Sequence, residues 1–311
     1  MKLSFEAVGP IFLLMLVGYI IKCTRMVDKK ELEAINKLVF RIFLPTLLFY
    51  DIYSTKISEI IDVKLILFVI AGIIAVFAVG LIFTLLITKE NTKRSVILQS
   101  LFRSNYAILG VPLVKYICGA DSGGLASFMI VIIVPLFNIL AVAALKIFGR
   151  GNEKLKISHF LKGIVTNPLI IGCITGLVFF LLDVRLPSVM HKAIGNISSV
   201  ASPLAIIVLG AGFDFSDTRG YIKELIVSVS ARLLIIPMLM LAFAVWLGFS
   251  GEALACVLVA FGAPVAVSSF SMVQQMGGDE KLAAQTIVIT SVGCLITLFG
   301  WIFTLSYFNL F

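Results

Sequence analysis

Residues 103 to 112, RSNYAILGVP, bring groups that can bind an anion into the middle of a long apolar run. Arg103 offers a guanidinium and Asn105 an amide. Gly110 and Pro112 follow. Proline interrupts a helix because it lacks an amide hydrogen and clashes with the preceding turn, while glycine tolerates the unusual backbone angles of a break. We therefore expect the helix to break at the Gly-x-Pro.

A second Gly-x-Pro, Gly262 with Pro264, lies in another apolar run and is followed by Ser268, Ser269 and Ser271. Helices that restart after the two prolines would present free amide hydrogens and about half a positive charge, which favours an anion. The serine hydroxyls could contact such a ligand, cap the helix or pack between helices. Four other prolines inside apolar runs are interpreted as kinks: Pro45, Pro135, Pro203 and Pro237.

The composition indicates which elements hold these residues. Hydrophobic residues make up 60% of the 311 residues and charged residues 14%, whereas soluble domains have roughly 45–50% and 25%. The apolar runs are long enough to cross about 30 Å of hydrocarbon as helices, and none alternates as a barrel strand does. We predict an all-α polytopic membrane protein with ten transmembrane helices, at about 5–22, 34–54, 63–88, 95–118, 124–148, 167–183, 189–213, 222–248, 252–276 and 282–308.

The net charge is +8, but the basic residues fall in short tracts between the apolar runs. Because they do not form one basic stripe, a nucleic-acid partner is not expected. Of the lysines and arginines, 17 lie around the odd-numbered connections and 6 around the even-numbered connections and the termini. Because cytoplasmic loops carry the excess of basic residues, both termini should lie outside the cell membrane. The five cysteines are scattered without metal-site spacing, and no cofactor or metal is expected.

An internal repeat relates the two halves of the chain. Residues 9–21 resemble 167–180, residues 43–52 resemble 201–214, and both matches have the same offset of 158 residues. The halves are 1–148 and 167–311, joined by a cytoplasmic connection at 149–166. Since each half holds five spans, the second must be inverted. Inverted repeats are the plan of many secondary transporters, which bind substrate near the midplane where discontinuous helices meet.

The chain resembles the auxin efflux carrier family, which includes the plant PIN-type auxin exporters and bacterial permeases described for malate or malonate. The matching pieces are AINKLVFRIFLPTLLF (34–49), NYAILGVPL (105–113), the Leu-Gly pair at 209–210 and Pro264. The resemblance implies a crossover of broken spans 4 and 9, a scaffold from spans 1, 2, 6 and 7, a transport unit from spans 3–5 and 8–10, and a homodimer. Asn105, Pro112 and Pro264 match the crossover residues of the family. After Pro264 the chain reads VAVSSF where plant members have an isoleucine-valine-proline run, so auxin itself is doubtful as a substrate.

Arg103 and Arg232 lie within spans, too deep for easy snorkelling. Arg103 could bind or guide an anionic substrate, or it could pair with a carboxylate for structural reasons. For Arg232 the structural pair is the preferred interpretation. No carboxylate is placed at the midplane by the pattern, so the sequence does not indicate a coupling ion.

We predict a secondary transporter of small organic anions, such as malate, malonate or auxin-like acids, working by alternating access in the cell membrane. The alternative is a cation/proton antiporter of a related fold, although spans 4 and 9 lack the acidic residues beside the breaks that it would need. An enzyme is not expected, since the two histidines lie in connections and no P-loop or zinc motif occurs. The predicted substrate-binding residues are Arg103, Asn105, Gly110, Pro112, Gly262, Pro264, Ser268 and Ser269.

Overall fold

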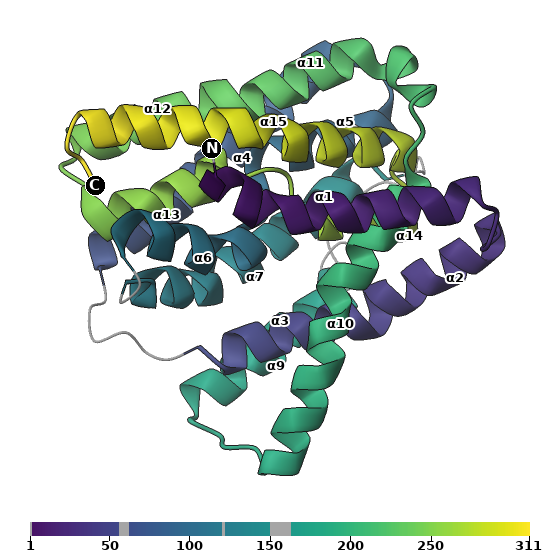
Figure 1. Ribbon diagram of the computed structural model, residues 1–311, viewed down its shortest axis with the longest axis horizontal. Helices are drawn as coiled ribbons and strands as arrows, with labels where there is room; N and C mark the ends of the chain where they lie inside the picture. The colour runs from purple at the N-terminus through teal and green to yellow at the C-terminus, as the bar shows by residue number, and fades with distance from the viewer. Residues whose placement is uncertain (1, 56–61, 120–121, 150–162) are drawn as a thin grey trace.

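The computed structural model describes residues 2–55, 62–119, 122–149 and 163–311. Regular structure in these residues is helical, and the one exception is an isolated β-bridge (Figure 1). Most of the predicted connection at 149–166 lies outside the described residues. The α-helices are α1 (Lys2–Cys23), α2 (Lys29–Leu38), α3 (Leu44–Tyr53), α4 (Val63–Ile87), α5 (Asn91–Phe102), α6 (Tyr106–Cys118), α7 (Gly124–Ile147), α9 (Pro168–Leu181), α10 (Ser188–Gly212), α11 (Ile222–Ser230), α12 (Ile236–Trp246), α13 (Gly251–Gly262), α14 (Ser268–Met276) and α15 (Glu280–Tyr307).

Two π-helical turns and a 3-10 turn join some of these helices end to end. The π turn η1 (Val39–Phe43) connects α2 to α3, and η3 (Ala231–Ile235) connects α11 to α12. The 3-10 turn η2 (Asp217–Tyr221) precedes α11. The π turn η3 carries Arg232, and π turns inside helices are frequent at functional sites.

Within the described residues, five helical segments are long and apolar enough to cross a membrane: α4, α7, α10, the continuous run Asp217–Trp246 and α15. Shorter apolar helices are Gly9–Cys23, α6, α9 and α13. These features are those of a polytopic membrane protein. The number of ten spans, the inverted repeat and the side on which the termini lie stay predictions.

Glycines bring two helix pairs into backbone contact. A Cβ added to Gly18 of α1 would lie 2.0 Å from the carbonyl oxygen of Ile207 in α10, and one on Gly210 would lie 2.1 Å from that of Met15. Gly172 of α9 approaches the backbone of α3 in the same way, followed four residues later by another glycine. Small residues drive helix association in membranes by this close approach, so α1 packs on α10 and α9 on α3.

Two helices are interrupted, and their breaks lie against each other. Between α5 and α6 residues 103–105 are not helical, and between α13 and α14 residues 263–267 are not. Ser104 forms an antiparallel bridge with Val265. The backbone N–H of Asn105 donates to the backbone carbonyl of Pro264 at 2.9 Å. The two breaks thus satisfy each other's backbone groups, as the membrane interior requires.

The first break lies earlier in the chain than we expected. Pro112 and Gly110 lie inside α6, which begins at Tyr106, so the prediction of a half-helix starting near Pro112 is wrong. Membrane helices tolerate an internal proline because neighbouring groups can satisfy the freed carbonyl. The chain instead unwinds at residues 103–105, where the facing segment supplies backbone partners. The second break is where we predicted it, since Pro264 lies between α13 and α14.

The start of α7 is capped by a carboxylate from another helix. Glu252 of α13 accepts hydrogen bonds from the backbone amides of Gly123, at 2.9 Å, and Leu125, at 3.0 Å. These amides belong to the donors that the first turn of a helix leaves unpaired. The contact connects α7 to the first turn of α13, at the end of this helix opposite its break.

Replacing Glu252 with alanine should destabilise the protein by about 1.5–3 kcal/mol, the contribution of hydrogen bonds to a charged group. Glu252→Gln retains an acceptor oxygen and should lose less. Thermal unfolding in detergent measures both. Equal melting temperatures for Glu252→Ala and the parent protein would show that the cap contributes nothing to stability.

Candidate functional site

Arg103 is the buried cation of the first break. It is 2% exposed, and its Nη2 donates to Asn138 Oδ1 at 2.8 Å and to Ser268 Oγ at 2.9 Å. Nη1 donates to Gln99 Oε1 at 3.3 Å. No carboxylate among the described residues pairs with it, so the predicted structural ion pair is not found there. The guanidinium is held in place by neutral groups and its charge is left without an anion.

A cavity of about 50 Å³ adjoins Arg103. Its only ionisable lining group among the described residues is this guanidinium. The polar lining residues are Ser104, Asn138, Ser202 and Ser268. The rest of the wall is apolar, from α3, α6, α7, α10 and residues 266–267 of the second break. Ser104 is 3% exposed and its hydroxyl has no partner within the described residues. A small anion would therefore meet one full charge, uncommitted hydroxyl groups and an apolar wall.

The structure brings some of the predicted site residues together and separates others. Arg103 and Ser268 meet at the cavity. Asn105 is 5% exposed and its side chain makes no hydrogen bond within the described residues, but it is not part of the cavity lining. Ser269 lines a different, smaller space, beside Gln99.

The glycines and prolines of the predicted site have backbone roles. Gly262 ends α13, and Pro264 supplies the carbonyl that accepts from Asn105. Gly110 packs against the ring of Tyr106 inside α6. Whether any of them contacts a substrate stays a prediction.

Asn138, Ser104 and Ser202 belong to the cavity and were missed by sequence reasoning. Asn138 had a usable signal, because it is one polar residue in the long apolar helix α7, and such residues usually face the protein interior. The two serines gave none, since serine is common at packed helix interfaces.

Arg232 differs from our expectation as well. It is fully buried, and its three hydrogen-bond acceptors among the described residues are backbone carbonyls rather than the carboxylate we predicted. The carbonyls belong to Leu101, Ala260 and Ala263, at the ends of α5 and α13.

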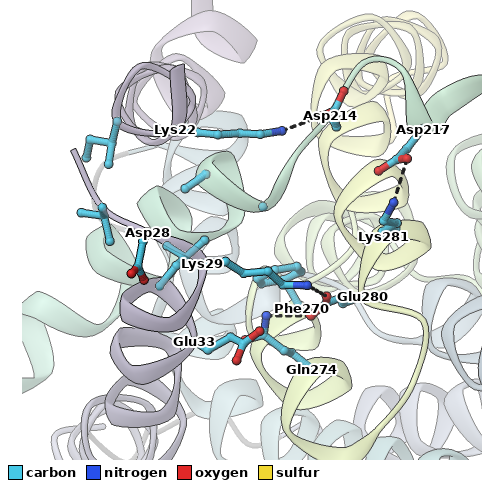
Figure 2. A pocket seen from close by; sticks show the side chains of 15 residues that line it. Lys22, Asp28, Lys29, Glu33, Asp214, Asp217, Phe270, Gln274, Glu280 and Lys281 are labelled. Atoms are coloured by element: carbon cyan, nitrogen blue, oxygen red, sulfur yellow. Dashed lines mark hydrogen bonds and ion pairs between the residues drawn. The ribbon is translucent and has the colours of Figure 1, made fainter. Parts of the chain in front are cut away.

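A larger cavity of about 280 Å³ lies between α1, α2 and α10 on one side and α14 and α15 on the other (Figure 2). We call it the charged pocket. Lys22 pairs with Asp214 at 2.8 Å, and hydrogen bonds from Lys22 and Ser216 hold the pKa of the Asp214 carboxyl well below its usual range. Its acidic lining residues outnumber the lysines: Asp28, Glu33, Asp214, Asp217 and Glu280 against Lys22, Lys29 and Lys281. The excess of carboxylates makes it a poor resting site for an anion.

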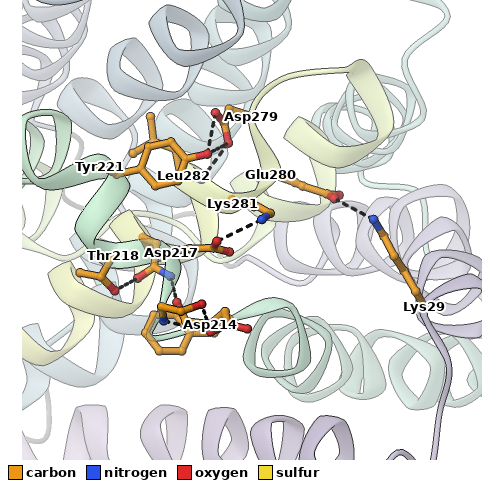
Figure 3. Close-up of polar contacts among 12 residues, drawn as sticks. Lys29, Asp214, Asp217, Thr218, Tyr221, Asp279, Glu280, Lys281 and Leu282 are labelled. Atoms are coloured by element: carbon orange, nitrogen blue, oxygen red, sulfur yellow. Dashed lines mark hydrogen bonds and ion pairs between the residues drawn. The ribbon is translucent and has the colours of Figure 1, made fainter.

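Ion pairs and hydrogen bonds link the rim of the charged pocket to the first turn of α15 (Figure 3). Lys281 pairs with Asp217 at 3.0 Å, and Lys29 lies 3.9 Å from Glu280. The hydroxyl of Tyr221 donates to the carboxylate of Asp279, the residue that caps α15. These charged groups pair with one another, whereas Arg103 has no carboxylate partner among the described residues.

Within the described residues, no group of three or more His, Cys, Asp or Glu side chains could hold a metal ion. The site is instead a buried cation in a cavity beside two facing helix breaks. Membrane transporters build binding sites from such discontinuous helices.

Comparison with known proteins agrees with this class. The family described as membrane transport protein matches residues 3–302. An uncharacterized transporter of Methanothermobacter thermautotrophicus is 24% identical over 304 residues, which cover 96% of this chain and 97% of that protein. A second uncharacterized transporter, from Methanocaldococcus jannaschii, is 26% identical over 316 residues, 96% of this chain and 99% of the relative. A protein of Rhizobium meliloti named "Putative malonate transporter" is 24% identical over 304 residues, 94% and 93% of the two chains.

The chain belongs to this membrane transport protein family, the auxin efflux carrier family that its motifs resemble. Membership agrees with a multi-pass membrane protein that transports a solute. The side of the membrane on which the termini lie, and a homodimer, stay predictions.

Proposed function

We propose that the protein is a secondary transporter of small organic anions, and that Arg103 binds the carboxylate of the substrate. The observation that carries this proposal is a 2% exposed arginine, beside a cavity, with no carboxylate partner among the described residues. A buried charge without a counter-charge is costly, and a bound anion would relieve that cost. The first turn of α14 adds to the attraction, because Ser268 begins this helix and its amide end is positive.

The lining of the cavity limits the kind of anion. One guanidinium can neutralise one carboxylate, and the remaining wall is mostly leucine, valine, alanine and phenylalanine. The charge of a second carboxylate on the substrate would have to be stabilised by the few hydroxyl and amide groups of the lining, or neutralised by a proton. The relative of Rhizobium meliloti is named for malonate, a dicarboxylate, so mono- and dicarboxylates both belong in the test.

Alternating access fits the position of the two cavities. If α1–α3, α9 and α10 form the scaffold and the remaining helices the transport unit, both cavities lie along the interface between them. Helix α14 separates the cavities: Ser268 faces the Arg103 cavity, while Phe270 and Gln274 line the charged pocket. The charged pocket would then be the entrance on the side of the first connection.

Contacts between α2 or α10 and α14 adjoin the charged pocket. The buried amide of Asn36 in α2 donates to Gln274, and its oxygen accepts from Ser271 Oγ at 2.6 Å. Phe270 packs against Gly212 of α10, where a Cβ would lie 2.8 Å from the ring. These contacts join scaffold to transport unit, and we propose that they separate when the substrate passes.

Uptake by the purified protein in proteoliposomes tests the function. We expect a labelled small carboxylate, from a panel of mono- and dicarboxylates, to accumulate and to exchange with unlabelled substrate inside. Imposed proton and sodium gradients distinguish coupled from uncoupled transport. Cation movement without any carboxylate flux would instead support a cation/proton antiporter.

A further inference from the structure

Arg232 donates hydrogen bonds to both interrupted helices and is not part of the lining of the Arg103 cavity. Its Nε donates to the carbonyl of Ala263 at 2.8 Å, Nη1 to that of Leu101 at 3.1 Å, and Nη2 to that of Ala260 at 3.2 Å. The side chain is 0% exposed and lies in the π turn η3. One guanidinium therefore reaches both broken helices.

The three acceptors lie at helix ends. Leu101 is in the last turn of α5, and Ala260 and Ala263 are at the end of α13. Carbonyls of a last turn have no partner within the helix and together carry about half a negative charge. Two such ends amount to about one negative charge, which Arg232 offsets with its single positive charge.

The helices that begin after the two breaks, α6 and α14, present their positive amino-terminal ends there. Ser268 starts α14, and the guanidinium of Arg103 lies 2.9 Å from its hydroxyl. Without Arg232, the negative ends of α5 and α13 would act on the same small volume and oppose the attraction of Arg103 for an anion. In the low-dielectric interior such partial charges are poorly screened.

We propose that Arg232 is a positioning residue that gives the crossing of the two helices its preference for anions. It neutralises the negative helix ends and fixes the break that carries Arg103, which lies two residues after Leu101. The effect on substrate is indirect, because Arg232 is not part of the cavity lining. This role rests on the proposed binding of a carboxylate at Arg103.

Substitutions at Arg232 should separate charge from geometry. Arg232→Met removes the charge at similar length, and should raise the KM for the transported carboxylate about tenfold or more. Arg232→Lys keeps the charge but lacks the planar fork, so it should recover part of the affinity. Both variants should also melt at a lower temperature.

Glu252→Ala is the matched control, because it loses the cap of α7 at the end of α13 opposite the break. It should lower stability while leaving KM unchanged. If its KM rises as much as that of Arg232→Met, the effect at Arg232 is only a loss of stability, and the proposal is wrong.

A cross-link between the two breaks gives a measurement that needs no substrate. Ser104 and Val265 form an antiparallel bridge, so cysteines at these two positions should oxidise readily to a disulfide when the five native cysteines are replaced. Adding Arg232→Met should slow this cross-link severalfold, and Arg232→Lys should slow it less.

The two measurements distinguish the possible failures. An unchanged cross-link rate together with an unchanged KM in Arg232→Met would overturn the role of Arg232. If the parent protein transports no carboxylate, the proposed function fails and the anion preference with it. The cross-link then still decides whether Arg232 positions the breaks.

Discussion

Replacing Arg103 with alanine should raise the apparent binding constant for a transported carboxylate by roughly tenfold to a hundredfold or more. Hydrogen bonds to a charged partner contribute about 1.5–3 kcal/mol, and about 1.4 kcal/mol is one factor of ten in affinity. The guanidinium is the sole cationic group in the cavity lining within the described residues, so no other side chain there would take over its charge. Concentration-dependent uptake in proteoliposomes measures the change.

Neighbouring substitutions give the scale against which this loss is judged. Ser268→Ala removes a neutral hydroxyl and should cost about tenfold at most, since a neutral hydrogen bond contributes about 0.5–1.5 kcal/mol. Asn105→Ala should be as mild or milder, because its amide is not part of the cavity lining. Arg103→Lys should recover part of the affinity, because lysine keeps the charge without the fork.

A measurement of stability distinguishes a substrate-binding role of Arg103 from a purely structural one. The guanidinium also holds Asn138 and Ser268 in place, and its removal leaves their polar groups without this partner. If Arg103→Ala melts at a lower temperature but binds substrate with the affinity of the parent protein, Arg103 is a structural residue. The proposed carboxylate site would then be wrong.

Gly210→Val should prevent α1 and α10 from packing and lower the melting temperature by several degrees or more. Its Cβ would lie 2.1 Å from the carbonyl oxygen of Met15 and 2.8 Å from the carbonyl carbon. Backbone atoms cannot turn away as a side chain can, so the cost should reach or exceed the upper end of the roughly 1–3 kcal/mol usual for overpacking. Thermal unfolding in detergent measures the effect.

Gly300→Ala is the control for this substitution. Gly300 lies within α15, and a Cβ there would meet nothing within 4 Å. Because alanine favours a helix more than glycine does, this variant should melt at the same temperature as the parent or slightly higher. A Gly210→Val protein that melts like Gly300→Ala would contradict the close approach of α1 and α10.

The physical roles of the motifs were partly predictable from sequence. The break at Pro264 was predicted from a Gly-x-Pro in an apolar run. Arg103 was predicted as a candidate site residue because it is a charged residue within an apolar run. The Leu-Gly pair at 209–210 matched a family pattern, but its reason is the contact of Gly210 with the backbone of α1, which depends on how two distant helices meet.

Tertiary partners account for the errors. Local sequence placed the first break at Pro112, yet a proline inside a helix needs only a local adjustment, whereas residues 103–105 gain backbone partners from the second break. Arg232 was expected to need a carboxylate, but two helix ends supplied its acceptors. Neither arrangement can be derived from the spacing of residues along one chain segment.

Locating a bound carboxylate tests the central claim most directly. A small brominated carboxylate that competes with transport can be placed in crystals of the protein by the anomalous scattering of its bromine. We expect the bromine within the cavity lined by Arg103, Asn138 and Ser268, with the carboxylate against the guanidinium. A bromine in the charged pocket beside Lys22 and Lys281, with none near Arg103, would contradict the account.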